Sequence, residues 1–480
     1  MTIFHRSSLV IAVAALPLGA CSYDQSGQSV ASTPAPVMQQ AEAPKKAKNV
    51  ILFIGDGMGI STITAARIYA GQKRGQTGEE YVLPFEKFEN VALVKTYNTN
   101  AQVADSAGTA TAMHSGKKTK IGVLGVGPGV TRGDCASGLA NELPLLGEQV
   151  KGRGMALGIV STARITHATP ASVYARAADR NWEADAAIPE GERGKGCDDI
   201  ASQLIASDFD VALGGGRRSF FGKDMDGRRL EAEANLPGEW TALKGGTYVE
   251  DLAALTAAPM GKPVLGLFSP SHMTYMAEKT GDKGASEPTL TQMTSAAMAR
   301  IKDDPDGYYL MVESGRIDHG HHAGKAGFAL EEADEFANAI QYAIDNTDPA
   351  ETLILVTADH SHVFTIAGYP RRGNDILGLV VPPSDGGDEV ASAAKAKDGK
   401  PYTTLGYGNG PGSIANMAER PMPETGIHAQ QQSAIPTGSE THAGEDVALY
   451  GNGPGADRVR GVIEQNLVYD IIVKALGWEK

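Results

Sequence analysis

The sequence predicts a three-layer α/β fold: a central, mostly parallel sheet covered by helices on both faces, with a small irregular insertion. Apolar runs of strand length, such as 49–54, alternate with segments of helical periodicity, such as 330–344. Such alternation is typical of βαβ units. Polar residues directly follow several of the apolar runs, which places them at the carboxyl edge of the sheet. The length of 480 residues fits one large domain or two average ones.

The expected strands are short apolar runs, as in strands that are buried on both faces. They are 49–54, 155–160, 211–213, 263–268, 308–312 and 352–357. Segment 330–344 places its large apolar side chains on one helical stripe. Residues 367–440 are rich in Pro, Gly, Ser and Gln and indicate a surface insertion. Two copies of Tyr-Gly-Asn-Gly-Pro-Gly, at 407–412 and 450–455, are interpreted as loops. Residues 459–476 are predicted to form a closing amphipathic helix.

The N-terminal residues indicate an export signal. His5 and Arg6 precede an apolar run, 9–16, that is too short to span a bilayer. The following Leu-Gly-Ala-Cys resembles a bacterial lipobox, in which Cys21 becomes the acylated first residue of the mature protein; an ordinary signal peptide cleaved nearby is the alternative. We therefore expect a signal at 1–21, a flexible tether at 22–48 and the enzyme-sized domain at 49–480. The expected location is periplasmic or at the cell surface, on a lipid anchor in a bacterial membrane.

The net charge and the cysteine content indicate which classes of protein fit the sequence. A formal charge of −14 argues against a nucleic-acid binder, which normally shows a basic face. Phosphate substrates stay possible, because metal ions can reverse the field inside one pocket. Besides Cys21 the chain contains Cys135 and Cys197, without CxxC spacing. In an exported protein a disulfide between them is favoured over two free thiols.

Residues 103–113 are predicted to contain the N-terminus of a helix, with a serine at its first positions. Asp105 and Ser106 are strong N-cap residues, and the Ala/Thr/Met run that follows continues as helix. The free N–H groups and the dipole of a helix N-terminus favour anions. Ser106 is therefore a candidate nucleophile for an anionic substrate, although a serine at this position is usually only a cap.

Metal-type residues gather in three further clusters. Asp318 and His322 are four residues apart, so one helical turn would aim both the same way. Asp359-His360 directly follows a strand, and His442 lies far away in sequence. Six of the 11 histidines fall in these clusters, at positions 319, 321, 322, 360, 362 and 442. Asp and His are suitable zinc ligands.

Seven separated motifs together resemble the alkaline phosphatases, in order from residue 49 to the C-terminus. They are Phe53–Gly59, Asp105–Thr111, His167–Pro170, Glu313, Asp318–His322, Thr357–His360 and Glu440–Asp446. The resemblance implies an enzyme that hydrolyses phosphate monoesters to alcohol and phosphate through a phosphoserine at Ser106. It also implies two zinc ions and one magnesium ion. The implied ligands are Asp318, His322 and His442 for one zinc, Asp56, Asp359 and His360 for the other, and Asp56, His167, Thr169 and Glu313 for magnesium.

The resemblance also assigns the residues around the metals. Arg180 would clamp two phosphate oxygens as a bidentate fork, with Asp105 orienting it. His167 and His319 stand where the enteric bacterial form has Asp and Lys, and in both places the chain is similar to the animal enzymes. A neutral His167 favours softer metals, so the third site could hold zinc instead of magnesium. The contexts of both cysteines match a disulfide of the animal type, and the family favours a homodimer.

Two alternative functions are considered. A phosphodiesterase or sulfatase of the same superfamily would typically use threonine or a modified cysteine as nucleophile, so Ser106 speaks against both. A non-catalytic zinc- or phosphate-binding surface lipoprotein would need neither Ser106 nor Arg180.

Overall fold

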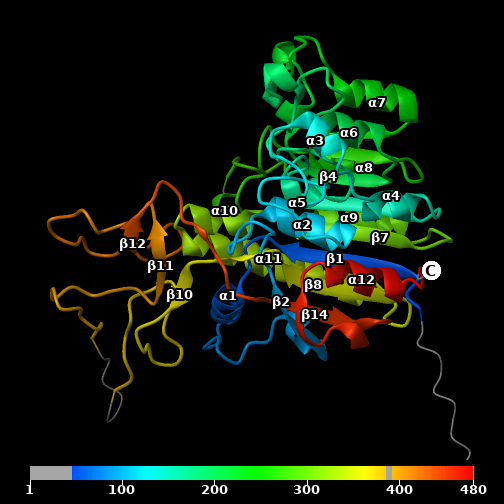
Figure 1. Cartoon of the computed structure of the whole chain (residues 1–480). Helices are drawn as coiled ribbons and strands as arrows, with labels where there is room; N and C mark the ends of the chain where they lie inside the picture. Colours follow the sequence, from blue (N-terminus) through cyan, green and yellow to red (C-terminus); the bar gives the residue numbers. More distant parts are fainter. Residues whose placement is uncertain (1–45, 280, 385–391, 479–480) are drawn as a thin grey trace, which may run out of the picture. The chain divides into compact units, whose positions relative to one another are not determined.

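A ten-stranded sheet forms the centre of the structure, a computed structural model that describes residues 46–279, 281–384 and 392–478 (Figure 1). One strand runs antiparallel to both of its neighbours, and all other neighbours pair in parallel. The sheet is therefore mostly parallel, as the sequence predicts. In spatial order its strands are β15 (Gly461–Glu464), β2 (Asn90–Lys95), the reversed β14 (Val447–Asn452), β8 (Thr352–Ala358), β1 (Asn49–Gly55), β7 (Tyr308–Ser314), β3 (Ala156–Arg164), β4 (Val211–Gly215), β6 (Val264–Leu267) and β5 (Thr247–Val249).

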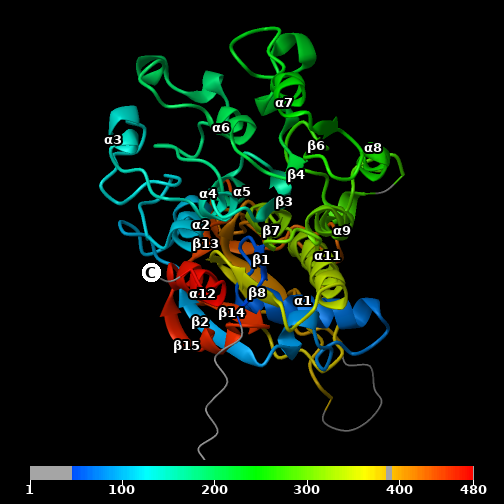
Figure 2. The same ribbon diagram turned by 90° about the vertical axis from the view of Figure 1, so that its right-hand side faces the viewer.

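Helices cover both faces of this sheet (Figure 2). On one face lie α1 (Ile60–Lys73), α9 (Leu290–Ile301) and α11 (Ala326–Asp345). On the other lie α2 (Ser106–Ser115), α4 (Leu146–Lys151), α5 (Ala168–Ala171) and α12 (Leu467–Ala475). The remaining α-helices of the described residues are α3 (Cys135–Leu139), α6 (Ile200–Ala206), α7 (Leu236–Lys244), α8 (Leu252–Ala257) and α10 (Arg316–His322).

The middle of the sheet is the core of the fold. All residues of β1, β7 and β8 are buried. Phe53 of β1 packs edge-on against Phe336 of α11, with ring centroids 5.9 Å apart. Burial of each such large side chain contributes about 1.5–3 kcal/mol before conformational entropy is counted. A rigid frame therefore lies directly beneath the carboxyl edge of the sheet.

The segment between β8 and β14 carries little regular structure. Its three-stranded sheet comprises β10 (Phe364–Ile366), β11 (Leu405–Gly410) and β12 (Ser433–Pro436), and a two-stranded ladder joins β9 (Ser361–His362) to β13 (His442–Ala443). In Figure 1 the three-stranded sheet lies to the side of the large sheet. The irregular insertion expected from the composition is thus observed.

Two local predictions are wrong. Residues 459–476 do not form one helix, because Gly461 at φ +73 starts the edge strand β15 and the helix begins only at Leu467. The Tyr-Gly-Asn-Gly-Pro-Gly copies are not loops throughout, because each begins inside a strand, β11 or β14. A Cβ on Gly451 would lie 2.8 Å from Val459, so glycine there allows Val459 to pack closely against β14 and does not mark a turn.

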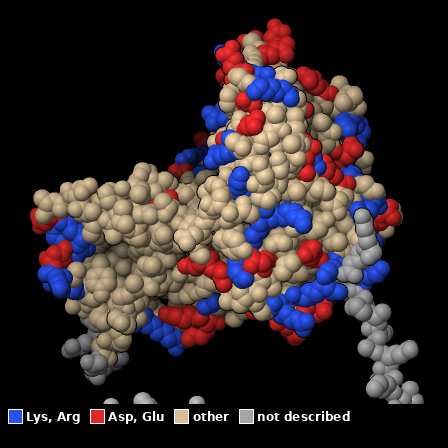
Figure 3. Space-filling model, in the orientation of Figure 1, with Lys and Arg blue, Asp and Glu red and all other residues tan. Residues whose placement is uncertain are grey.

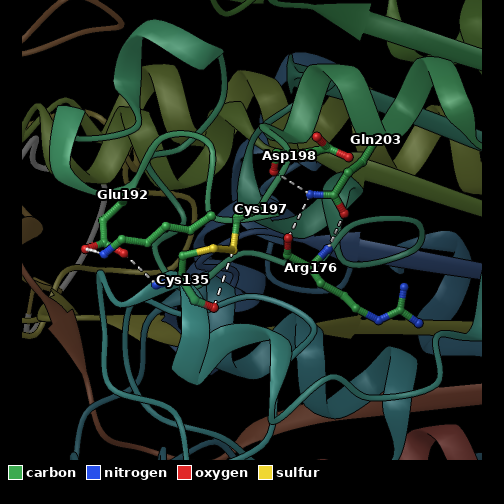
Figure 4. Close-up of a disulfide and its surroundings, with 7 residues drawn as sticks. Cys135, Arg176, Glu192, Cys197, Asp198 and Gln203 are labelled. Atoms are coloured by element: carbon green, nitrogen blue, oxygen red, sulfur yellow. Dashed lines mark hydrogen bonds and ion pairs between the residues drawn. A yellow bond between two sulfur atoms is a disulfide. The ribbon is translucent and has the colours of Figure 1, made fainter.

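The predicted disulfide joins Cys135 to Cys197, with Cα atoms 5.8 Å apart (Figure 4). Cys135 begins α3, and its N–H donates to Glu192. The disulfide lies in a small hydrophobic cluster, separate from the main core, that includes Val126 and Trp182. It therefore ties together chain segments on both sides of residues 179–182.

The expected signal at 1–21, its Cys21 and the tether up to residue 45 lie outside the described residues. From residue 46 the chain meets the folded body, since the N–H of Ala47 donates to the carbonyl of Ala475. None of the helices in the described part of the chain has both the length and the apolar character needed to cross a bilayer.

Candidate active site

Polar residues that follow the central strands meet at one edge of the sheet. Asp56 follows β1, Glu313 lies near the end of β7, and Asp359-His360 follows β8. Because β8, β1 and β7 are adjacent and parallel, their carboxyl ends lie side by side. All four side chains are fully buried. This is the place that strand-end reasoning predicts.

The hydroxyl of Ser106 lies among these residues. Ser106 is the first residue of α2, and the carboxylate of Asp105 caps the helix by accepting from the N–H of Gly108 at 3.1 Å. Ser106 Oγ is 3.1 Å from Nε2 of His360 and 3.3 Å from Oδ1 of Asp56. The helix start therefore delivers the hydroxyl directly to the metal-type side chains.

Asp318, His322 and His442 form the first group of candidate cation ligands. Within α10 the one-turn spacing brings Asp318 Oδ1 to 3.2 Å from His322 Nε2, and His442 Nε2 lies 3.1 Å from the same nitrogen. The Nδ1 atom of each histidine is within hydrogen-bond distance of a backbone carbonyl. His322 contacts the carbonyl of Glu440, and His442 contacts that of Ala104. An Nδ1–H that donates there leaves the Nε2 lone pair free for a metal.

Asp56 belongs to two further groups. The first contains Asp359 and His360, and the second contains Glu313 and His167; within each group the possible ligand atoms lie within 4.8 Å of one another. Thr169, two residues after His167, is also fully buried. The structure thus brings together every residue that the resemblance assigns to a metal.

The buried carboxyl groups in these clusters favour the binding of cations. Burial raises the pKa of Asp56, and the negative charges of Asp359 and Asp318 raise it further. Burial likewise raises the pKa of Glu313 to about 7, against the lowering effect of its hydrogen bond from Ser161. Buried carboxylates of this kind are stable as anions only when paired or bound to a metal. Within the described part of the chain, the buried oxygens Glu313 Oε1, Thr169 Oγ1 and Asp359 Oδ2 have no hydrogen-bond partner, which also fits cation binding.

Arg180 supplies the fixed positive charge of the site. Its Nη1 donates to Asp105 Oδ2 at 3.0 Å, and Nη2 lies 3.0 Å from Nε2 of His167. Burial lowers the pKa of Arg180, but the carboxylates of Asp105 and Asp56 outweigh it and raise the pKa overall. The guanidinium is therefore held in one orientation with further N–H groups available.

Two buried residues next to the first ligand group have no role in the sequence prediction. His362 Nε2 lies 2.9 Å from Asp318 Oδ1, and its Nδ1 lies 2.6 Å from Glu440 Oε2. Burial lowers the pKa of His362, but its hydrogen bonds with these two carboxylates raise it to about 9. His362 falls in a cluster that the sequence shows, whereas the role of Glu440 has no signal beyond its nearness to His442.

A cavity of about 320 Å³ opens onto the serine. His319 lies on its wall and in none of the cation groups; its ring packs 5.7 Å from His167 and 4.0 Å from His272. The contacts of His272 and Arg164 here were not foreseen from the sequence. The lining residues are Ser106, Arg164, His167, Arg180, Asn181, Glu183, Asp318, His319, His322 and His442.

A hydroxyl, an arginine and bound cations are the groups with which proteins bind and transfer a phosphoryl group. Fold and site therefore define a metal-dependent phosphoryl-transfer hydrolase. The chain belongs to the alkaline phosphatase family, whose family model, described as alkaline phosphatase, matches residues 47–478. It is a hydrolase of phosphate monoesters, as the resemblance implies.

Known alkaline phosphatases are similar in sequence to this protein over most of the chain. The chain is 44% identical over 445 residues to the tissue-nonspecific alkaline phosphatase isozyme of Gallus gallus, covering 88% of this chain and 83% of that one. Identity to the Homo sapiens tissue-nonspecific isozyme is 42% over 453 residues, with 89% and 83% covered.

Solved structures support the fold. The alkaline phosphatase of Thermus thermophilus aligns with a TM-score of 0.67 at 22% identity, covering 94% of this chain and 96% of that one. The enzyme from the Antarctic bacterium TAB5 aligns with a TM-score of 0.62 at 23% identity, covering 91% and 100%. At these identities the likeness concerns the fold alone.

Proposed function

We propose that Ser106 is the nucleophile of this phosphate monoesterase and forms a phosphoserine intermediate. A bond forms between Ser106 Oγ and phosphorus while the bond from phosphorus to the substrate oxygen breaks and the alcohol departs. Water then cleaves the phosphoserine, which releases phosphate and restores the hydroxyl. The observation that carries this proposal is the position of Oγ at the start of α2, 3.1 Å from His360 Nε2 and 3.3 Å from Asp56 Oδ1.

Arg180 binds the phosphate in this proposal. Its guanidinium can present two parallel N–H groups to two phosphate oxygens. The free N–H groups at the start of α2 favour the same anion. Asp105 holds Arg180 by the contact at 3.0 Å and caps α2 with its other oxygen, so one carboxylate positions both phosphate-binding elements.

The cofactors we propose are two zinc ions and one magnesium ion. Asp318, His322 and His442 would hold the first zinc ion. The second would be held by Asp56, Asp359 and His360, and magnesium by Asp56, His167, Thr169 and Glu313. Bound zinc lowers the pKa of a hydroxyl group and stabilises the negative charge on the oxygens of a phosphoryl transfer. Because His167 is a neutral ligand, zinc is the alternative for the third site, and metal analysis by mass spectrometry distinguishes the two.

The phosphoserine is tested with Ser106→Ala. Wild-type protein quenched in acid during turnover of p-nitrophenyl phosphate should carry one added phosphate group on the peptide that contains Ser106. The Ser106→Ala variant should lose turnover by about a thousandfold or more and carry no phosphate. Ser115→Ala is the matched control, since Ser115 ends the same helix and bonds to Thr111 instead of the site. Unchanged turnover in Ser106→Ala would overturn the assignment.

The same assay separates the rival activities. We expect p-nitrophenyl phosphate to be turned over faster than the bis-ester and the sulfate. Preference for the diester would replace the monoesterase by a diesterase. Tight zinc binding with no turnover in the wild type would indicate a non-catalytic binder.

The anchor proposed at Cys21 follows from the lipobox-like sequence before it. It would place the enzyme on the periplasmic or outer side of a bacterial membrane. Intact mass and N-terminal peptide mass of the mature protein test this proposal. A mature chain that begins with unmodified residues beyond Cys21 would contradict the anchor and favour an ordinary cleaved signal.

We also propose a homodimer that uses the insertion between β8 and β14. Large apolar side chains are exposed there: Tyr369 is 91% exposed, and Met422 and Ile435 are each 61% exposed. Figure 3 shows few charged side chains on the upper surface of this insertion and the adjoining body. Light scattering should give a dimer for the wild type and a shift towards monomer for Tyr369→Glu. A monomeric wild type at micromolar concentration would contradict it.

A further inference from the structure

We propose that Arg164, which lines the same cavity as Asn181, forms a second anion subsite that selects phosphate monoesters carrying another anionic group. This inference rests on the proposed function, because Ser106 and Arg180 are taken to hold the phosphate that is cleaved. Arg164 is thereby a specificity-determining residue for the alcohol part of the substrate.

The cavity has room for more than one phosphate group, and all of its walls are polar. Its volume is about 320 Å³, and a water-sized group takes about 30 Å³, so about ten such groups fit where a phosphate has five heavy atoms. None of the ten lining residues has an apolar side chain. An aryl or alkyl leaving group finds no apolar wall there, whereas a charged or hydrogen-bonding one does.

Arg164 is fixed in place and still has donors to offer. Its Nε and Nη2 each donate to Glu183 at 2.7 Å, and Nη1 contacts Nε2 of His272. A guanidinium has five N–H groups, so these contacts leave two for a ligand. Its side chain is 20% exposed, while that of Glu183 is 7% exposed, so a ligand reaches the arginine more readily. Asn181 also lines the cavity, and its side-chain amide has no protein partner among the described residues.

Positive charge exceeds negative charge at this end of the cavity. Glu183 is shared by Arg164 and Arg228, whose Nη2 lies 3.4 Å from it. Burial lowers the pKa of Arg228, and the charge of Arg164 lowers it further, against the raising effect of Glu183. Two guanidiniums thus share one carboxylate. An anionic group on the substrate would reduce this excess.

Substitution of Arg164 and substitution of Glu183 should change the selectivity for substrates with a second anionic group in opposite directions. Arg164→Gln removes the cation, and Glu183→Gln removes the anion at constant size; both break the same ion pair. The readout is kcat/KM for 3-phosphoglycerate divided by that for glycerol 1-phosphate, which differ in a carboxylate against a hydroxymethyl group. A second ratio, glucose 1,6-bisphosphate over glucose 6-phosphate, uses a phosphate as the second anion.

We expect Arg164→Gln to lower both ratios about tenfold and Glu183→Gln to raise them. Arg217→Gln is the matched control with unchanged ratios, because Arg217 comes after the neighbouring strand β4 and pairs with Glu250. Ratios that move in the same direction in both variants, or in neither, would overturn the subsite, since general damage to the fold has no preferred sign. If Ser106→Ala keeps the wild-type turnover of p-nitrophenyl phosphate, the proposed function itself fails. If that variant loses turnover and the ratios stay unchanged in the Arg164 and Glu183 variants, only the subsite fails.

Discussion

At the scale of single residues, Asp105 connects the helix start to the phosphate clamp. One carboxylate oxygen accepts from Gly108 N–H and from the amide of Asn98, at 3.1 and 3.0 Å. The other accepts from Gly122 N–H at 2.9 Å and from Arg180 at 3.0 Å. All four contacts come from donors, so only a group with two acceptor oxygens satisfies them.

We predict that Asp105→Asn lowers kcat/KM for p-nitrophenyl phosphate by about tenfold to a hundredfold. The amide can still cap α2 with its oxygen, but its NH2 group would face two donors and release Arg180; a hydrogen bond to a charged group is worth about 1.5–3 kcal/mol. Bound zinc, measured by mass spectrometry, should be unchanged. Loss of zinc together with activity would show that Asp105 acts on the metal groups instead.

Part of the candidate site was predictable from local patterns alone, whereas Arg180, His167 and Thr169 were assigned only through the resemblance to the family. Asp56 and Asp359 directly follow buried strands, and Asp318 and His322 are one helical turn apart. Glu440 and Arg164 had no such signal. Their roles depend on contacts with His362 and Glu183, and a contact between distant segments follows from tertiary packing instead of any local pattern.

At the scale of elements, the turn from β1 into α1 needs a glycine for two reasons. Gly57 has φ +70, and a Cβ there would lie 2.3 Å from Nε2 of His362. We predict that Gly57→Ala weakens zinc binding. It should also lower the free energy of unfolding by clearly more than about 1–2 kcal/mol, which is the cost of a left-handed backbone conformation alone. Gly75→Ala is the control: its φ is +76 and its Cβ would meet nothing within 4 Å. Equal losses in urea unfolding would contradict the steric argument.

Helix α11 buries an acidic side chain away from the site. Glu332 is 1% exposed, and burial raises its pKa to about 7. The N–H of Met276, which donates to it at 2.7 Å, and the charges of Arg316 and Lys279 lower the pKa, while Glu335 raises it. The folded pKa lies above the ordinary value of 4.5, so the folded state binds more protons than the unfolded state between these pH values.

The stability contributed by this proton is present below about pH 4.5 and lost as pH rises through about 7. Glu332→Gln keeps the acceptor for Met276 and never ionises. We predict that it raises the free energy of unfolding by up to about 3 kcal/mol at pH 8, with little change at pH 5. Glu331→Gln, which loses an ion pair with Lys73 at the surface, should change stability little at either pH. An equal effect of Glu332→Gln at both pH values would contradict the raised pKa.

The elements themselves were predictable where burial is uniform. Strands β1, β7 and β8 are buried on both faces and therefore read as continuous apolar runs. Strand β15 lies at the sheet edge, and Val462 is 57% exposed. Its apolar residues therefore do not form a continuous run, and the sequence did not distinguish the strand from the helix that follows. Glycines inside β14 looked like turn signals because sequence alone does not show which side chain packs against them.

At the scale of the whole molecule, the carboxyl edge of the sheet concentrates negative charge in a chain that is already acidic. The formal charge is −14, and Asp56, Glu313, Asp318 and Asp359 are all buried within one site. In the absence of cations these carboxylates raise the pKa of Asp56 and Asp359 on top of the effect of burial. Cation binding should therefore stabilise the whole fold as well as the site.

We predict that EDTA abolishes turnover and lowers the melting temperature by roughly 5 °C or more, because a ligand present at a thousandfold its Kd contributes about 4 kcal/mol. Zinc with magnesium should restore both. Ser106→Ala should show the same fall and recovery in melting temperature without turnover, because its hydroxyl is assigned to catalysis and all the assigned metal ligands remain. That variant separates metal-linked stability from activity. Protein shown by mass spectrometry to be metal-free, yet fully active and unchanged in melting temperature, would rule out the metal assignment.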